Sequence, residues 1–169
     1  MLWADGGLQV YAVAMGSRIP DLAVTLAAAD VLDFDCLLPG ALSDEAQRSA
    51  PYLVLLKPES AFTDWLLFEA AAGLGEWGVL ALSATKMMPL RGHLRGLLNA
   101  QTPTGLTFRL DWMDPTILQA LLPLFDAAAL KAFTGPLHAL VIPGPSAWVT
   151  ASLAAGKVEI RSIPVSRGG

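Results

Sequence analysis

The sequence predicts an α/β fold in which a central mixed sheet is flanked by helices and the chain ends in a β-hairpin. Short apolar runs alternate with segments of helical period, as expected when helices cover a sheet. Two of these runs, residues 52–56 and 79–82, lack polar alternation, which is typical of interior strands buried on both faces. The length of 169 residues suits one domain. We assign this domain to residues 1–165 and expect residues 166–169 to be a frayed tail.

The first half of the chain contains strands interrupted by two helices. In chain order we expect a strand over residues 8–15, a helix over 21–29, a strand over 34–38, a strand over 52–56, a helix over 61–72 and a strand over 79–82. Ser60 can cap the second helix. Phe62, Trp65 and Leu66 follow at the i, i+3, i+4 spacing of one helix face, and Gly73 stops the helix.

The second half contains three helices and then three strands. We expect helices over residues 86–99, 115–122 and 127–133, strands over 137–142, 147–153 and 158–163, and a turn at 154–156. The clearest helix start is Asp114-Pro115, where an N-cap carboxylate precedes a proline at the first helical position. Asp126 caps the last helix in the same way. The final two strands form the predicted C-terminal hairpin.

Composition argues against nucleic acid as a partner and against a membrane-spanning helix. The net charge of −4 leaves no basic excess to neutralise a phosphate backbone. The longest stretch without a charged residue, 132–156, contains Pro136, Pro143 and Pro145, which would interrupt a membrane-spanning helix. The start of the chain lacks a basic region followed by an apolar run, and the lone Cys36 cannot form an internal disulfide. We therefore expect a cytoplasmic protein.

Residues 73–78 fit the string G-x-G-x-x-G of dinucleotide-binding loops, but their context is reversed. That mechanism places the loop after a strand and before a helix, so that phosphate meets the N-terminus of the helix. Here the predicted helix ends at Gly73 and a strand follows Gly78. We interpret the segment as a helix stop and a tight turn, and we expect no cofactor.

The side chains available for catalysis or metal binding are few. No zinc-ligand spacing is present, and Cys36 is expected to be a small core residue rather than a reactive thiol. Asp111 and Asp114 could form a carboxylate pair, although Asp114 is more simply a helix cap. His93 flanks the apolar stripe of its helix, where a half-buried structural histidine is typical. An α/β enzyme would have to draw its catalytic groups from Ser17, His93, His138, Asp111 and Asp114.

The predicted helix over residues 86–99 carries candidates for contact with a partner. Arg91 and Arg95 lie at i, i+4 and predict a solvated cationic edge. Gly92 and Gly96 lie on the back of the helix, where each costs about 1 kcal/mol relative to Ala. They either let a partner backbone approach closely or carry no selected role. The five tryptophans are more typical of core anchors than of interface contacts, but Trp112 lies outside the clear apolar stripes and is the best interface candidate among them.

Six segments of the chain follow an order found in a known family. They are residues 11–20 (YAVAMGSRIP), 50–54 (APYLV), 77–78 (WG), 93–95 (HLR), 113–115 (MDP) with Leu118 and 121–123 (LLP), and 133–136 (FTGP). In these segments the chain resembles the small adaptor or chaperone proteins of bacterial type VI secretion, long catalogued as a domain of unknown function. The resemblance implies a non-catalytic protein that binds a cognate toxic effector in the donor cytoplasm and helps load it onto the secretion spike protein.

The resemblance also implies which residues occupy motif positions. These are Arg18, Trp77, His93, Arg95, Asp114 and Pro115. Because Trp77, Asp114 and Pro115 have sufficient structural roles, the predicted partner-binding residues are Arg18, Arg91, Arg95 and Trp112. The chain departs from the family pattern before Asp114, where Asp-Trp-Met stands in place of the usual arginine and aromatic, and Arg109 lies upstream. It is also too short for the helical second lobe that many members carry.

Three hypotheses about function follow, and each predicts a different surface. An adaptor predicts an apolar groove or patch rimmed by polar groups. A small hydrolase or nucleotide-binding enzyme predicts Ser, His and Asp side chains that converge in a cleft. A purely structural subunit of a larger complex predicts a large, permanent or symmetric interface.

Overall fold

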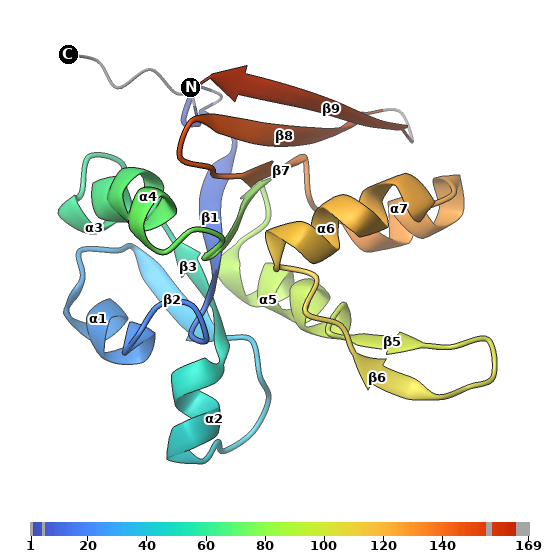
Figure 1. The fold of residues 1–169 in the computed structure, drawn as a ribbon, viewed down its shortest axis with the longest axis horizontal. Helices are drawn as coiled ribbons and strands as arrows, with labels where there is room; N and C mark the ends of the chain where they lie inside the picture. The colour runs from blue at the N-terminus through green and yellow to red at the C-terminus, as the bar shows by residue number, and fades with distance from the viewer. Residues whose placement is uncertain (1, 5, 155–156, 165–169) are drawn as a thin grey trace.

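The computed structural model describes residues 2–4, 6–154 and 157–164, and its centre is a seven-stranded sheet with helices on both faces (Figure 1). The strand order is β2-β3-β1-β4-β7-β8-β9. The strands are β1 Gln9–Met15, β2 Asp33–Cys36, β3 Pro51–Leu55, β4 Gly78–Ser83, β7 Ala139–Ile142, β8 Ala147–Ala154 and β9 Lys157–Pro164. The α/β class and the C-terminal β-hairpin, formed by β8 and β9, are confirmed.

The described neighbouring strands all pair antiparallel, whereas we expected a mixed sheet. The register of β1 shows why, because Tyr11 lies opposite Leu55 of β3 on one side and Ala81 of β4 on the other. β3 and β4 therefore run in the same direction with β1 between them. The helical connection from β3 to β4 crosses over β1, so these two strands never become the parallel neighbours that a crossover usually joins.

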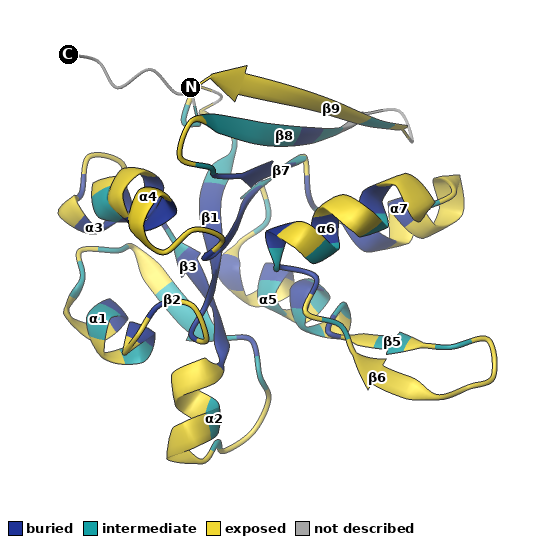
Figure 2. Cartoon of the chain, in the orientation of Figure 1, coloured by how far each residue is buried: buried dark blue, intermediate teal, exposed yellow. Residues whose placement is uncertain are grey.

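Side chains of β1 alternate between two hydrophobic cores, one on each face of the sheet. The strand is buried along most of its length (Figure 2). Tyr11 and Val13 face a first core that includes buried residues of α5, α6 and α7. Val10 and Ala12 face a second core that includes buried residues of α1, α3 and α4. Because helices cover both faces, β1, β3 and β4 are apolar on both sides, as predicted for interior strands.

Three helices, α3, α6 and α7, begin where a capping side chain was predicted. They are α1 Leu22–Ala28, α2 Asp44–Ser49, α3 Ala61–Asp64, a π-helical segment Trp65–Ala70, α4 Ala71–Gly73, α5 Met87–Gly96, α6 Pro115–Leu121, a 3-10 turn Leu122–Leu124 and α7 Ala127–Thr134. The Ser60 hydroxyl accepts a hydrogen bond from the Thr63 N–H at 3.2 Å. The Asp126 carboxylate accepts one from the Ala129 N–H at 2.7 Å. The helix before residues 73–78 and the strand after them confirm the reversed order that argued against a dinucleotide loop.

Two elements were not predicted, and neither has a buried apolar stripe. Helix α2 has a Ser43 cap but no buried residue, so no hydrophobic period marks it. The hairpin of β5 Asn99–Gln101 and β6 Thr107–Arg109 is mostly exposed and extends away from the sheet (Figure 1). The helix expected over residues 86–99 therefore ends at Gly96, and the chain turns directly into β5.

The apolar stretch 132–156 contains the end of α7 and the strands β7 and β8. No helix among the described residues combines the length and the apolarity needed to cross a membrane. The predicted turn at 154–156 falls largely on residues 155–156, and the predicted tail is 166–169. Both of these segments lie outside the described residues.

Candidate functional site

The turn after β1 meets the start of α6 at one end of the sheet. Arg18 Nη2 lies 3.5 Å from Asp114 Oδ2, and the Arg18 side chain is 49% exposed while that of Asp114 is 16% exposed. The same carboxylate accepts hydrogen bonds from the N–H groups of Thr116 and Ile117 at 2.9 and 3.4 Å. Asp114 is therefore the predicted N-cap of α6, and it also holds Arg18 beside the helix start.

Trp77 lies at the same end of the sheet, where its side chain packs in the second core. Its side chain is buried, and its carbonyl oxygen accepts a hydrogen bond from the Met15 N–H at 2.9 Å. Beside it, the Glu76 carboxylate accepts a hydrogen bond from the Thr116 hydroxyl at 2.9 Å. Three of the segments behind the family resemblance therefore meet here, and Trp77 has the structural role that was expected.

His93 links two further motif segments. Its Nε2 lies 2.8 Å from the carbonyl oxygen of Phe133, and the ring is half-buried. Gly135 lies so close that an added Cβ would come within 2.5 Å of the imidazole Cε1. This confirms the interpretation of His93 as a hydrogen-bonded structural residue.

Arg91 and Arg95 point from α5 toward the end of β2, which corrects the expectation of a solvated cationic edge. Arg91 forms an ion pair with Asp35. Arg95 donates hydrogen bonds to the carbonyl oxygens of Cys36, Leu37 and Leu38 at 3.1, 2.8 and 3.5 Å. The Arg91 guanidinium thus binds a carboxylate of β2, and the Arg95 guanidinium satisfies carbonyl oxygens at the end of β2 and in the loop that follows it. These contacts tie α5 to the edge of the sheet.

A polar cavity of about 380 Å³ lies beside these arginines. Its lining includes Arg91, Arg95, Asp35, Cys36 and Tyr52. Burial raises the pKa of the Cys36 thiol above its ordinary value, and the nearby Asp35 acts in the same direction. A raised pKa disfavours the thiolate, which fits the prediction that Cys36 is not a reactive nucleophile.

Trp112 is fully buried, which corrects the expectation that it lies on the surface for contact with a partner. The indole belongs to the first core and meets Phe133 edge-on, with ring centroids 5.8 Å apart. The residue lies in the irregular segment before α6, where helical periodicity gives no information about burial. Tertiary packing folds this segment under the helices.

The five candidate catalytic side chains are distributed over several places. Ser17 and Asp111 line one pocket of about 340 Å³, and Arg109 holds the Asp111 carboxylate at 2.8 Å. His93 lies against α7 and His138 is exposed before β7. Among the described residues, His, Cys, Asp and Glu side chains form no group of three that could hold a metal ion.

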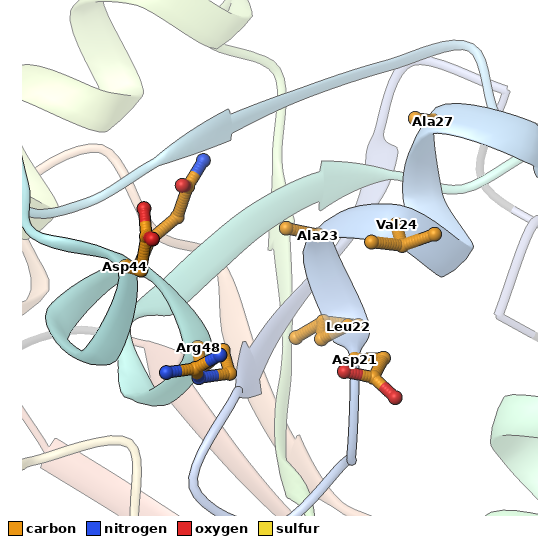
Figure 3. Close-up of a pocket in the computed structure, with 8 residues that line it drawn as sticks. Asp21, Leu22, Ala23, Val24, Ala27, Asp44 and Arg48 are labelled. Carbon is orange, nitrogen blue, oxygen red and sulfur yellow. The ribbon is translucent and has the colours of Figure 1, made fainter.

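A groove with an apolar floor lies between α1 and α2 (Figure 3). It has a volume of about 460 Å³ and is lined by Asp21, Leu22, Ala23, Val24, Ala27, Asp44, Gln47 and Arg48. The floor comes from α1, where Leu22 is buried in the second core and Val24 is 71% exposed. The polar side chains of α2 and Asp21 form the rim. Sequence reasoning missed this groove because α2, one of its two walls, was not predicted.

Residues 10–132 match a protein family described as a domain of unknown function, DUF4123. The chain belongs to this family. No curated protein and no solved structure matches the chain.

The DUF4123 region contains the features described above. It begins in β1 and ends within α7, so the groove, the arginine cavity and the Arg18–Asp114 pair all lie inside it. The strands β7, β8 and β9 lie outside it. The DUF4123 match therefore covers the first four strands of the sheet, and the chain completes the sheet with its own C-terminal segment.

The capping role of Asp114 in this DUF4123 chain can be tested by substitution. We expect Asp114→Ala to lower the free energy of unfolding by about 1 kcal/mol, because the carboxylate satisfies two N–H groups of α6. The matched control is Asp111→Ala, whose carboxylate pairs with Arg109 at the surface and should matter by less than about 0.5 kcal/mol. Urea unfolding followed by tryptophan fluorescence measures both. Equal losses for the two variants would contradict the capping role.

Proposed function

We propose that this protein is a non-catalytic adaptor that binds a cognate type VI secretion effector in the cytoplasm and helps load it onto the spike protein. Two things support the proposal. The chain resembles the type VI adaptor or chaperone proteins in six ordered segments, and several of these segments contact one another in the fold. The groove between α1 and α2 is the feature that an adaptor needs and supplies the observation on which the proposal rests.

The groove suits a polypeptide partner because apolar and charged groups are arranged in two zones. Val24 and Ala27 present apolar surface to solvent, because both are exposed in the structure. Asp21 and Asp44 on the rim leave an excess of negative charge over Arg48. A partner segment that places apolar side chains on the floor and a basic side chain beside the rim would complement both zones.

Of the arginines predicted to face a partner, Arg18 is the one whose position suits that role. It is exposed, whereas Arg91 and Arg95 are half-buried and bound to β2 or its loop. Arg18 also lies three residues before Asp21, in the turn that leads to the rim of the groove. We therefore assign Arg91 and Arg95 a positioning role and retain Arg18 as a candidate contact at the edge of the binding surface.

The decisive experiment is capture of the toxin encoded beside this gene by the co-expressed protein, with one variant in the groove and one outside it. Val24→Asp places a carboxylate on the floor, and we expect at least about a tenfold loss of captured toxin because a buried charge opposes apolar contact. Leu106→Asp is the matched control on the β5–β6 loop, because Leu106 is 69% exposed and Val24 is 71% exposed. Both variants should keep the wild-type unfolding midpoint.

The outcomes separate the proposal from its alternatives. Capture by wild type and by Leu106→Asp but not by Val24→Asp supports an adaptor that uses the groove. Loss in Leu106→Asp alone would move the binding surface to the hairpin and overturn the assignment of the groove. Failure of the wild-type protein to capture the toxin at all would overturn the adaptor function.

A further inference from the structure

Strand β9 ends the sheet with an unpaired backbone edge. It is eight residues long and pairs only with β8 among the described residues, whereas β2 at the opposite edge has four residues. In Figure 1 β9 forms the upper border of the molecule, and none of the described helices lies outside it. An edge of this length is a template for pairing with another extended chain.

The direction of the backbone groups on β9 follows from one side-chain contact. The carbonyl oxygen of Arg161 accepts a hydrogen bond from the Thr150 hydroxyl on β8 at 3.3 Å, so the backbone of Arg161 faces β8. Backbone groups of successive residues in an antiparallel strand alternate in direction. The N–H and C=O groups of Val158, Ile160 and Ser162 therefore face outward, free of partners in the described structure.

The side chains of β9 carry both apolar surface and an ordered charge pattern. Ile160 is 53% exposed and Ile163 is 44% exposed. Glu159 and Arg161 flank Ile160 and form a surface ion pair of 3.0 Å, with side chains 59% and 74% exposed. The strand thus has opposite charges placed symmetrically about an exposed isoleucine.

We propose that β9 pairs antiparallel with β9 of a second copy of this chain, around a two-fold axis at Ile160. In this register the two Ile160 residues exchange their outward N–H···O=C bonds, and Val158 of each copy lies opposite Ser162 of the other. Glu159 of each copy then lies opposite Arg161 of its partner. The two sheets become one continuous sheet, and this surface is independent of the proposed effector groove.

Charge selects this register over its neighbours. Only registers that bring outward-facing residues opposite one another can form the ladder, so the axis must pass through a residue. An axis at Glu159 sets two carboxylates face to face, and an axis at Arg161 does the same for two guanidinium groups. Like charges directly opposite each other destabilise a strand pair, whereas opposite charges stabilise it. The charges that discourage unspecific edge pairing therefore favour the axis at Ile160 over an axis at Glu159 or at Arg161.

The test uses two charge reversals whose mixture distinguishes this register from any general effect. In sedimentation velocity over a range of concentrations, we expect the wild-type protein to form a dimer. Glu159→Arg and Arg161→Glu should each weaken self-association about tenfold, because every cross-strand pair becomes a like-charge pair. An equimolar mixture of the two variants should restore the dimer, since two arginines of one copy then face two glutamates of the other.

The controls keep the proposal open to contradiction. Both charged side chains are mostly exposed, so the variants should keep the wild-type unfolding midpoint. Lys57→Glu changes the net charge as Arg161→Glu does but at a distant surface ion pair, and it should leave the dimer unchanged. A monomeric wild type at every concentration, or a mixture that stays monomeric, would overturn the proposal. The proposal would also be overturned if the wild-type protein is monomeric and its Arg161→Glu variant loses captured toxin, because β9 would then pair with a strand of the effector.

Discussion

The Gly78→Ala variant is expected to lose about 4 kcal/mol of its free energy of unfolding, from backbone strain and overpacking that each cost about 1–3 kcal/mol. Gly78 begins β4 with a φ of +149°, a conformation that side chains rarely adopt. An added Cβ would lie 2.1 Å from the carbonyl oxygen of Val13 and 3.1 Å from the Ala14 Cα. Both obstacles are backbone atoms of β1, the strand between the two cores, so no side chain can move away to relieve the contact.

Urea unfolding of wild type, Gly78→Ala and Gly73→Ala tests this directly. Gly73 ends α4 with no atom within 4 Å of an added Cβ, so its alanine variant should be unchanged or stabilised by a few tenths of a kcal/mol. The comparison separates the cost of the close approach from the general effect of removing a glycine. Similar unfolding midpoints for the two variants would show that β1 and β4 can separate to accept a side chain at Gly78.

The contrast between predicted and unpredicted elements has a physical basis. Elements that bury one apolar face leave a period in the sequence, and this is why α6 and α7 were recognised close to their observed bounds. Helix α2 and the β5–β6 hairpin bury almost nothing, so only local capping and turn residues mark them. The direction of the strands could not be predicted from the sequence either, because the crossover that carries the chain over β1 is a property of the whole sheet.

The candidate site shows the same division. Residues with a local role, such as the Asp114 cap, were predicted correctly because the capping bond forms within three residues. Arg91 and Arg95 were expected in solvent because their partners, the Asp35 carboxylate and the carbonyl oxygens of residues 36–38, are more than fifty residues away in sequence. The groove needed α2, and α2 leaves no apolar period to find. The sequence signal for α2 was Ser43 as a possible N-cap, followed by the acidic residues Asp44 and Glu45.

Because Trp112 is buried, we expect its substitution to change the stability of the protein rather than its binding of a partner. We also expect its removal to have the largest effect on stability of any side chain in the first core. Trp112→Ala is expected to lower the free energy of unfolding by about 3–5 kcal/mol, because it leaves a cavity under α7 and removes the edge contact with Phe133. The indole N–H has no hydrogen-bond partner in the described structure, so Trp112→Phe loses no hydrogen bond and should cost less. Phe108→Ala, on the exposed hairpin, should change stability by less than about 0.5 kcal/mol.

Thermal unfolding of the three variants, measured beside toxin capture at a temperature where each is folded, decides what Trp112 does. A core residue predicts that any lost capture by Trp112→Ala is proportional to lost folded protein, and that Trp112→Phe restores both together. A contact residue predicts lost capture at an unchanged unfolding midpoint, which would mean that the segment before α6 leaves the core when a partner binds. Val24 lies on the groove floor and Trp112 in the first core. The unfolding midpoint should therefore fall more for Trp112→Ala than for Val24→Asp, whereas toxin capture by the folded protein should fall more for Val24→Asp.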